Sequence, residues 1–220
     1  MGDLKRIIVG MKNKAPGNSG IRKSIMEKCP EIALRKYMEL INHSLSLAYF
    51  PKIIKYAILR LIVKEREDPK NPINYRPILL LEFPGKIFER LINERLTKYL
   101  EEHNKLNNNQ YAFRKGRGTQ QAIATLYETV ALSQREGYRC NVKCRDVAKA
   151  FDKVWLDGLK FKILQLELPE LYERLLSDFI TNRTAAIKLN NAISEEIKLQ
   201  SGVPQGSILS PTLYSIWMPS

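Results

Sequence analysis

The sequence has few cysteines and histidines, and it lacks any long uninterrupted run of apolar residues. It has three cysteines and two histidines in 220 residues, and the odd, sparse cysteine count argues against a disulfide framework and for a reducing compartment. No apolar run is long enough to cross a bilayer, and the opening letters MGDLKR fit neither a signal peptide nor a myristoylation signal. We therefore expect an intracellular, soluble protein without membrane contact, in the nucleus or the cytoplasm.

Metal ligation by cysteine is also disfavoured. Cys140 and Cys144 share one side of a stretch that alternates like a strand, and no second pair of ligands follows nearby. His43 and His103 are far apart in the sequence and form no ligand pattern. We therefore predict that both cysteines are small buried side chains rather than metal ligands.

Acidic residues are the minority charge. Lysine and arginine together number 36 against 23 aspartates and glutamates, a formal net charge of +13. Such a charge favours a polyanionic partner, because each neutralised phosphate releases condensed counterions. A merely soluble basic surface is the alternative. Hydrophobic residues make up 44% of the chain, which predicts a packed core rather than wholesale disorder.

Internal repeats and low-complexity tracts are absent, and apolar spacing predicts a mixture of helices and strands. The expected helices cover residues 32–45, 85–102, 120–136 and 169–181. The expected strands cover 56–63 and 138–147, with a hairpin at 184–200 that turns at Asn190-Asn191. Loops are expected at 11–20, 64–77 and 201–206, and a last helix at Ser210-Pro211 with Ser210 as its N-cap. This mixture indicates an α/β or α+β fold.

Four blocks of sequence carry the functional information. They read NYRPILLL at 74–81, NQYAFRKGRGT at 109–119, DVAKAFDKVW at 146–155 and SGVPQGSILSP at 201–211. In order and spacing they resemble the reverse transcriptases of non-LTR (LINE/Jockey-like) retrotransposons, which read SYRPISLL, GFRKGRST, LDVEKAFDKVW and AGVPQGSVLSP. The letters KAPG at 14–17, followed by GI, extend the resemblance to nearly the whole chain. Group II intron and retron enzymes share the chemistry, but these spellings favour the non-LTR kind.

The resemblance implies an RNA-directed DNA polymerase with an α+β, right-hand fold. It assigns residues 51–220 to the fingers and an incomplete palm, with palm strand and loop near 138–155 and 201–220, and leaves 1–50 as a preceding loop and helix. We expect no thumb within these 220 residues. The implied partners are an RNA template, a DNA primer and a dNTP. The oligomeric state is left open.

The resemblance makes Asp146 the first catalytic aspartate and a ligand of Mg²⁺, with the carbonyl of Val147 as a further ligand. Nucleotide addition uses two divalent ions that hold the attacking and leaving oxygens, and Mg²⁺ prefers carboxylate oxygens. An aspartate that closes a strand, as Asp146 is expected to do, suits this role. An ordinary aspartate at a strand end is the alternative.

Residues of three blocks are implied to meet the incoming nucleotide. Phe151 would exclude a 2′-hydroxyl by its bulk, although a core phenylalanine is the alternative. Gln205 would lie against the nucleotide and Gly206 would allow close approach of the backbone to the template, whereas turn glycines need no such role. Arg76 would hold the triphosphate bidentately, with Lys64 sharing the load or remaining a surface cation.

The block at 109–119 suits contact with template backbone, through Arg114, Lys115 and Arg117. A generic basic turn is an equal alternative for these three residues.

The sequence departs from the family pattern in two places. It contains no Asp-Asp pair, the core of the family's third carboxylate block, and the last residue is Ser220. Lys143 and Arg145 stand before Asp146 where the family has apolar residues, and both would be costly to bury unpaired. We therefore expect that this chain alone does not hold two magnesium ions or add nucleotides. A non-catalytic nucleic-acid-binding remnant, or a folded remnant without function, is the alternative.

Overall fold

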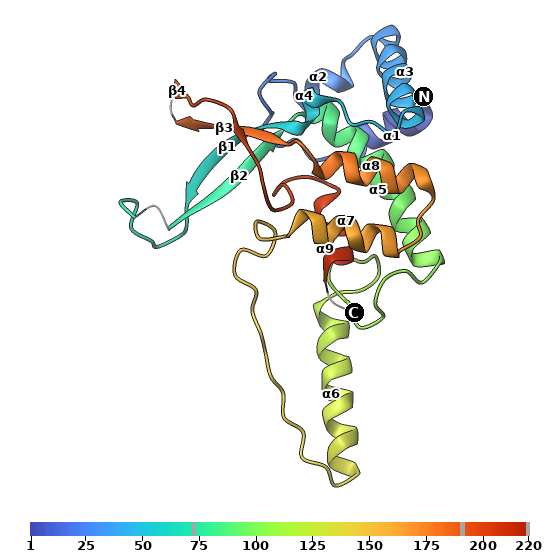
Figure 1. Cartoon of the computed structure of the whole chain (residues 1–220), viewed down its shortest axis with the longest axis vertical. Helices are drawn as coiled ribbons and strands as arrows, with labels where there is room; N and C mark the ends of the chain where they lie inside the picture. Colours follow the sequence, from blue (N-terminus) through green and yellow to red (C-terminus); the bar gives the residue numbers. More distant parts are fainter. Residues whose placement is uncertain (72–73, 190–191, 219–220) are drawn as a thin grey trace.

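A computed structural model describes residues 1–71, 74–189 and 192–218, and it combines helices with one small sheet (Figure 1). The helices are α1 Gly2–Gly10, α2 Lys23–Glu27, α3 Glu31–Ser46, α4 Lys52–Lys55, α5 Phe83–Glu102, α6 Thr119–Arg135, α7 Leu156–Gln165, α8 Glu170–Ile180 and α9 Ser210–Trp217. The strands are β1 Tyr56–Val63, β2 Tyr75–Leu81, β3 Thr184–Leu189, β4 Ala192–Ile193 and β5 Ile197–Lys198. Runs of helices and strands follow one another without regular alternation, in agreement with an α+β fold. No helix in the described ranges is long and apolar enough to span a membrane.

Most elements expected from periodicity are confirmed. The expected helices correspond to α3, α5, α6 and α8, and the expected strand at 56–63 is β1. The hairpin at 184–200 appears as β3 with two antiparallel partners, β4 and β5, while its turn at Asn190-Asn191 lies outside the described residues. The predicted loop at 64–77 was too long, because β2 already begins at Tyr75.

The sheet consists of two hairpins, β1–β2 and β3–β4, which are joined by parallel pairing of β1 with β3. Its strand order is β2-β1-β3-β4, and β5 pairs with β3. β1 and β2 are antiparallel from Ala57↔Leu81 to Val63↔Tyr75. β1 and β3 are parallel only as far as Leu59↔Ile187. Beyond this pair the β1–β2 hairpin and the β3–β4 hairpin diverge, as Figure 1 shows.

The main hydrophobic core forms along one side of α5. Phe88, Ile92, Leu96 and Leu100 follow one another at helical spacing and are almost completely buried. Phe50 packs between Phe88 and Phe179, with ring centroids 4.7 and 4.9 Å apart. A second cluster joins α1 to the start of α5 and includes Leu4, Ile7, Phe83 and Ile87. The long helix α5 therefore contributes side chains to both hydrophobic clusters.

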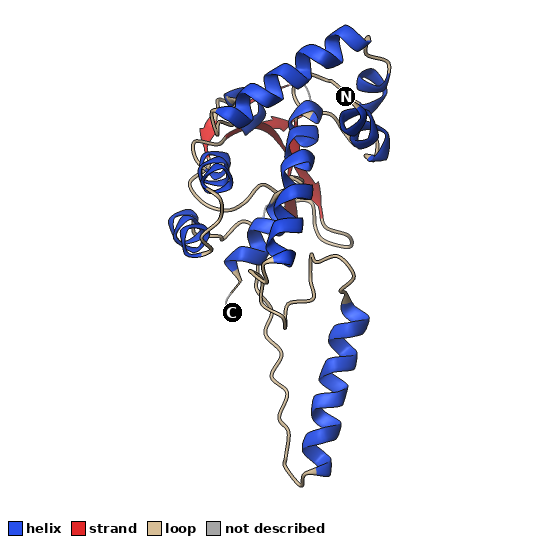
Figure 2. Ribbon diagram, turned by 90° about the vertical axis from the view of Figure 1, so that its right-hand side faces the viewer, coloured by secondary structure: helices blue, strands red, loops and turns tan. Residues whose placement is uncertain are grey.

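The predicted strand at 138–147 is wrong. Residues 136–149 are exposed and contain no strand, and Figure 2 shows α6 and the following chain projecting from the rest of the molecule. A strand needs a hydrogen-bonded neighbour, and none of the described strands pairs with this segment. The predicted burial of Cys140 and Cys144 is wrong for the same reason, since both are exposed. Lys143 and Arg145 are exposed too, so their expected burial cost does not arise.

The start of α9 also differs from the prediction. Leu209, not Ser210, is the N-cap, and no side chain of the N-cap residue bonds to the helix. The hydroxyl of Ser207 instead accepts hydrogen bonds from the backbone N–H groups of Leu209 and Ser210, at 3.1 and 3.2 Å. Pro211 lies in the first turn as expected.

Candidate functional site

Two of the four blocks meet although about fifty residues separate them. The Val203 N–H donates to the Phe151 carbonyl and the Gly202 N–H to the Val154 carbonyl, both at 2.9 Å. The Gln205 side-chain amide donates to a carboxylate oxygen of Asp152, also at 2.9 Å. The structure therefore brings Phe151 and Gln205 together on one hydrogen-bonded unit.

Gly202 makes this close approach of two backbones possible. Its φ is +83°, and a Cβ there would lie 2.8 Å from the Asp152 carbonyl oxygen. A side chain at this position would be strained by the backbone conformation and would also clash with neighbouring backbone.

Gly206 places the same loop against the edge of the sheet. Its φ is +107°, and a Cβ would lie 3.0 Å from the carbonyl oxygen of Leu79 in β2. Because Leu79 belongs to the NYRPILLL block, a third block reaches the same region. The predicted close approach at Gly206 is therefore an approach to protein backbone, and its role toward template stays a prediction.

Phe151 lies in a small aromatic cluster rather than in the deep core. Its ring stacks on Tyr214 of α9, with centroids 4.9 Å apart and an interplanar angle of 19°. Phe113 meets both rings edge-on, at 5.8 and 6.4 Å, and remains 52% exposed. Sequence reasoning missed Phe113 and Tyr214. The cluster also brings the NQYAFRKGRGT block beside Phe151, so all four blocks gather at one place.

A buried glutamate supports the loop from below. Glu89 of α5 accepts hydrogen bonds from the Ser207 hydroxyl and the Ile208 N–H at 2.6 Å, and from the Leu209 N–H at 3.3 Å. Burial raises the pKa of Glu89 above its ordinary value, and the loop donors and the charge of Arg183 oppose this rise. Burial lowers the pKa of Arg183 to about 10. Sequence reasoning missed both residues, because each looked like part of an ordinary helix or loop.

Asp146 does not join this group. It lies five residues before Phe151 in the exposed segment 136–149, and Val147 is 55% exposed beside it. No group of three or more His, Cys, Asp or Glu residues suitable for a metal ion exists among the residues that the structure describes. One carboxylate does not satisfy two magnesium ions, so the described residues do not form a complete metal site.

Arg76 and Lys64 belong to the same hairpin, formed by β1 and β2. Arg76 of β2 pairs with Ile62 of β1 and its side chain is exposed. Lys64 directly follows β1, and its backbone N–H donates to the Asn74 carbonyl at 2.9 Å. The β1–β2 hairpin therefore brings the backbones of Arg76 and Lys64, the two predicted triphosphate ligands, close together.

The three predicted template cations lie in different environments. Arg114 is buried, donating to Glu101 at 2.8 Å and to the Asn107 carbonyl at 2.6 Å, and this contact lowers the pKa of Glu101. Arg117 donates to the Asn108 carbonyl, whereas Lys115 is exposed. Arg114 and Arg117 thus hold their own loop together, and template binding by these residues stays a prediction.

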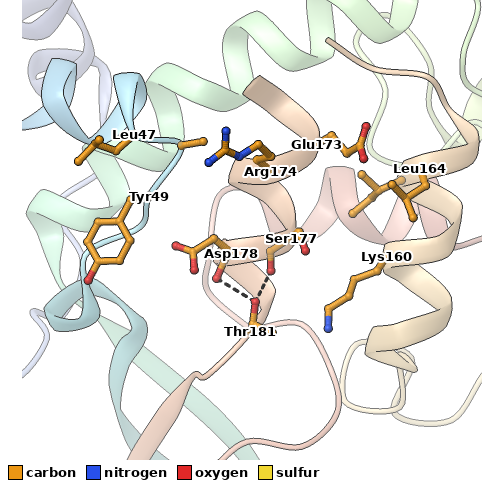
Figure 3. A pocket seen from close by; sticks show the side chains of 11 residues that line it. Leu47, Tyr49, Lys160, Leu164, Glu173, Arg174, Ser177, Asp178 and Thr181 are labelled. Atoms are coloured by element: carbon orange, nitrogen blue, oxygen red, sulfur yellow. Dashed lines mark hydrogen bonds between the residues drawn. The ribbon is translucent and has the colours of Figure 1, made fainter. Parts of the chain in front are cut away.

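A separate hollow lies away from these blocks. It has a volume of about 510 Å³ and lies between the segment 47–49, α7 and α8 (Figure 3). Figure 3 shows Arg174, Ser177 and Asp178 of α8 lining it together with Tyr49. None of the predicted site residues lines it.

Comparison with known proteins agrees with the four blocks. The family model described as reverse transcriptase (RNA-dependent DNA polymerase) matches residues 68–220. Among curated proteins, the chain is 35% identical over 211 residues to the probable RNA-directed DNA polymerase from transposon X-element of Drosophila melanogaster, covering 96% of this chain and 23% of that protein.

Two further relatives from the same organism give the same result. The RNA-directed DNA polymerase from mobile element jockey is 33% identical over 98% of this chain and 24% of its own length. The probable RNA-directed DNA polymerase from transposon BS is 32% identical over 93% of this chain and 22% of its own length. The chain thus spans about a quarter of the length of these relatives. From its matching family model and these relatives, the chain belongs to the reverse transcriptase (RNA-dependent DNA polymerase) family, in the branch of non-LTR retrotransposons.

Proposed function

We propose that this chain is the fingers and part of the palm of an RNA-directed DNA polymerase that copies RNA onto the 3′ end of a primer. One observation carries the proposal. The loop with Gln205 is hydrogen-bonded to the turn with Phe151, and at Gly206 the same loop approaches Leu79 of β2, the strand that bears Arg76. A nucleotide pocket needs groups for the base, the sugar and the phosphates in one place, and this arrangement supplies them.

Each residue then has a distinct role. The Phe151 ring, supported by Tyr214, would lie beneath the sugar and exclude a 2′-hydroxyl. The Gln205 amide would contact the nucleotide, and the Arg76 guanidinium, with Lys64, would hold the triphosphate. Arg114, Lys115, Arg117 and Gly206 would position the template strand, Arg114 and Arg117 by shaping the loop that presents Lys115.

The β1–β2 hairpin would belong to the fingers, and residues 138–155 and 201–220 to the palm. Residues 1–50 would form a preceding unit that supports α5.

This chain would supply only some of the ligands of the magnesium site. Reverse transcriptases use divalent ions to activate the primer hydroxyl and to neutralise the leaving phosphate. Asp146 and the Val147 carbonyl would be the ligands that this chain contributes. Because no group of three or more candidate ligands occurs among the described residues, we expect no nucleotide addition by this chain alone.

Nucleotide binding by the chain itself tests the proposal without catalysis. Fluorescently labelled dTTP is titrated with the purified chain, and anisotropy reports binding. Arg76→Gln should weaken binding by roughly 10- to 100-fold, because charge-assisted hydrogen bonds to phosphate would be lost. Arg95→Gln on α5 is the matched control, since Arg95 is also exposed and lies outside the four blocks. Equal losses in the two variants would reject the assignment of Arg76.

Competition and incorporation complete the test. Phe151→Val should raise the affinity for UTP relative to dTTP, since the smaller side chain admits the 2′-hydroxyl. Incorporation of labelled dNTP on an RNA template should stay at background for the chain and for Asp146→Asn alike. Incorporation that Asp146→Asn abolishes would show that the chain holds enough metal ligands after all.

The second candidate is a non-catalytic nucleic-acid-binding module. It is supported by the net charge of +13 and by the incomplete set of metal ligands in the described ranges. This candidate predicts salt-dependent binding of nucleic acid without binding of dTTP.

A further inference from the structure

Asp152 places a carboxylate directly beside the residues proposed to meet the nucleotide. It follows Phe151 in the chain, and its side chain accepts a hydrogen bond from Nε2 of Gln205 at 2.9 Å. Both side chains of this pair are half-buried. No lysine or arginine in the described ranges forms an ion pair with Asp152. The carboxylate is therefore committed to the Gln205 amide rather than to a cation.

The backbone of Asp152 is held by the same loop that carries Gln205. The Ser201 hydroxyl donates to the Asp152 carbonyl at 3.3 Å, and the Asp152 N–H donates to the Lys149 carbonyl at 3.0 Å. Gly202 lies so close that a Cβ there would be 2.9 Å from the Cα of Asp152. Because the backbone of Asp152 is held in this way, its carboxylate is presented to Gln205 before any nucleotide binds.

The chemistry of the two groups selects one orientation of the Gln205 amide. A primary amide carries a donor NH₂ group at one end and an acceptor oxygen at the other, and the two ends have nearly the same shape. An ionised carboxylate only accepts hydrogen bonds. The NH₂ group therefore faces Asp152 and the carbonyl oxygen is turned away from it, whereas the flipped amide would set two acceptors against each other.

The charge of Asp152 by itself would disfavour a bound nucleotide. A triphosphate is a polyanion, so a nearby carboxylate weakens its binding through like-charge repulsion. If this charge were all that mattered, removing the carboxylate would strengthen the binding of dTTP. If the carboxylate prepares Gln205 for the nucleotide, removing it weakens binding. The sign of the change in affinity therefore separates the two effects.

We propose that Asp152 is a positioning residue for nucleotide addition, which holds the Gln205 amide so that its carbonyl oxygen is directed at the incoming nucleotide. A glutamine side chain that is already ordered loses less rotational freedom when the nucleotide binds. The inference rests on the proposed function for the contact between Gln205 and the nucleotide, whereas the orientation of the amide can be measured without it.

Binding of fluorescently labelled dTTP to the whole 220-residue chain tests this role in a double-mutant cycle. Asp152→Ala should weaken binding by roughly 3- to 10-fold, because the freed glutamine must be ordered again when the nucleotide binds. In a Gln205→Ala background the same substitution should not weaken binding further. Asp152→Asn keeps the size of the side chain but lets two amides pair in either direction, so it should weaken binding only about 2-fold.

The matched control is Asp157→Ala. Asp157 is an exposed carboxylate five residues farther along the chain, and it pairs with Lys160 at 3.2 Å rather than with the loop that carries Gln205. Its removal takes away the same charge and should not weaken the binding of dTTP. Circular dichroism and urea unfolding check that every variant folds like the unmodified chain. If Asp152→Ala does not fold, Asp152→Asn takes its place in the double-mutant cycle.

NMR of the chain labelled with ¹⁵N at glutamine reads the amide without any nucleotide. The side-chain signals of Gln205 are identified by their absence from Gln205→Ala. The Nε2 protons of Gln205 should exchange with water more slowly than those of the exposed Gln200. This protection should disappear in Asp152→Ala and persist in Asp157→Ala.

Three results would overturn the positioning role. The first is binding of dTTP by Asp152→Ala that is as tight as, or tighter than, that of the unmodified chain. The second is an equal loss from Asp152→Ala with and without the Gln205 side chain, since Asp152 would then not act through Gln205. The third is equal exchange of the Gln205 Nε2 protons with and without the carboxylate. If these protons are protected but the unmodified chain does not bind dTTP, the proposed nucleotide contact fails and the orientation of Gln205 by Asp152 is supported.

Discussion

At the residue scale, Glu89 fixes the loop that carries Gln205. Its carboxylate accepts three hydrogen bonds from residues 207–209 in a fully buried place. Glu89→Ala should lower the free energy of unfolding by about 3 kcal/mol or more, since three donors, two of them buried, would lose their acceptor. Glu89→Gln should cost less, because its amide oxygen still accepts. Urea unfolding measures both, with Glu102→Ala at the exposed end of α5 as control.

The same residue gives a pH prediction. Burial raises the pKa of Glu89 in the folded state, so the folded chain binds its proton more tightly than the unfolded chain. The stability of the unmodified chain relative to Glu89→Gln should be highest below the ordinary carboxyl pKa of about 4.3. It should fall as the pH rises through the raised folded value. If the difference in unfolding free energy between the unmodified chain and Glu89→Gln stays constant between about pH 4 and about pH 8, this account is contradicted.

Single residues also mark where sequence reasoning reached its limit. Phe151 and Gln205 were recognised by their motifs, and the structure places them together. Glu89, Arg183 and Tyr214 were missed, because their roles come from contacts with residues more than 60 positions away in the sequence. Such contacts depend on how elements pack, which local spacing does not encode.

At the scale of elements, we expect the exposed segment 136–149 to open more easily than the packed elements of the described chain. Residues 139–148 form no backbone hydrogen bonds with other described residues, and α6 before them buries no side chain. Limited trypsin digestion should therefore cut first after Arg139, Lys143 or Arg145. Mass spectrometry identifies the first fragments. The triple variant Arg139→Gln/Lys143→Gln/Arg145→Gln should survive longer, whereas first cuts inside α3 or α5 would disprove the prediction.

The wrong strand prediction at 138–147 has the same physical origin. Alternation of side chains reports which faces a strand would present, but a strand forms only when another backbone supplies hydrogen bonds. Strands β1 and β3 were predicted correctly because each has such a neighbour. The apolar side chains of α6 are exposed for a related reason. Ile123 and Tyr127 are 61% and 73% exposed, so helical spacing predicted the helix correctly without showing what would cover it.

At the scale of the whole molecule, one buried ion pair joins the N-terminal third to α8. Asp178 accepts hydrogen bonds from the Phe50 N–H at 2.6 Å and from the Lys55 ammonium group at 2.7 Å. The Lys55 side chain is 5% exposed and that of Asp178 is 30% exposed. These contacts span more than 120 residues, and they lie where the segment before β1 meets the helix before β3.

Removing one charge of the Lys55–Asp178 pair should therefore lower the free energy of unfolding more than replacing both residues. Asp178→Ala leaves the Lys55 charge buried and unpaired, which should destabilise the fold by about 3–5 kcal/mol. In Lys55→Met/Asp178→Asn the charge is gone, an apolar stem fills the same space, and the amide oxygen still accepts from the Phe50 N–H. This double variant should lie within about 1 kcal/mol of the unmodified chain. Urea unfolding compares the variants, with Asp157→Ala on the exposed side of α7 as control. If the double variant is at least as unstable as Asp178→Ala, the cost comes from lost packing rather than from an unpaired charge.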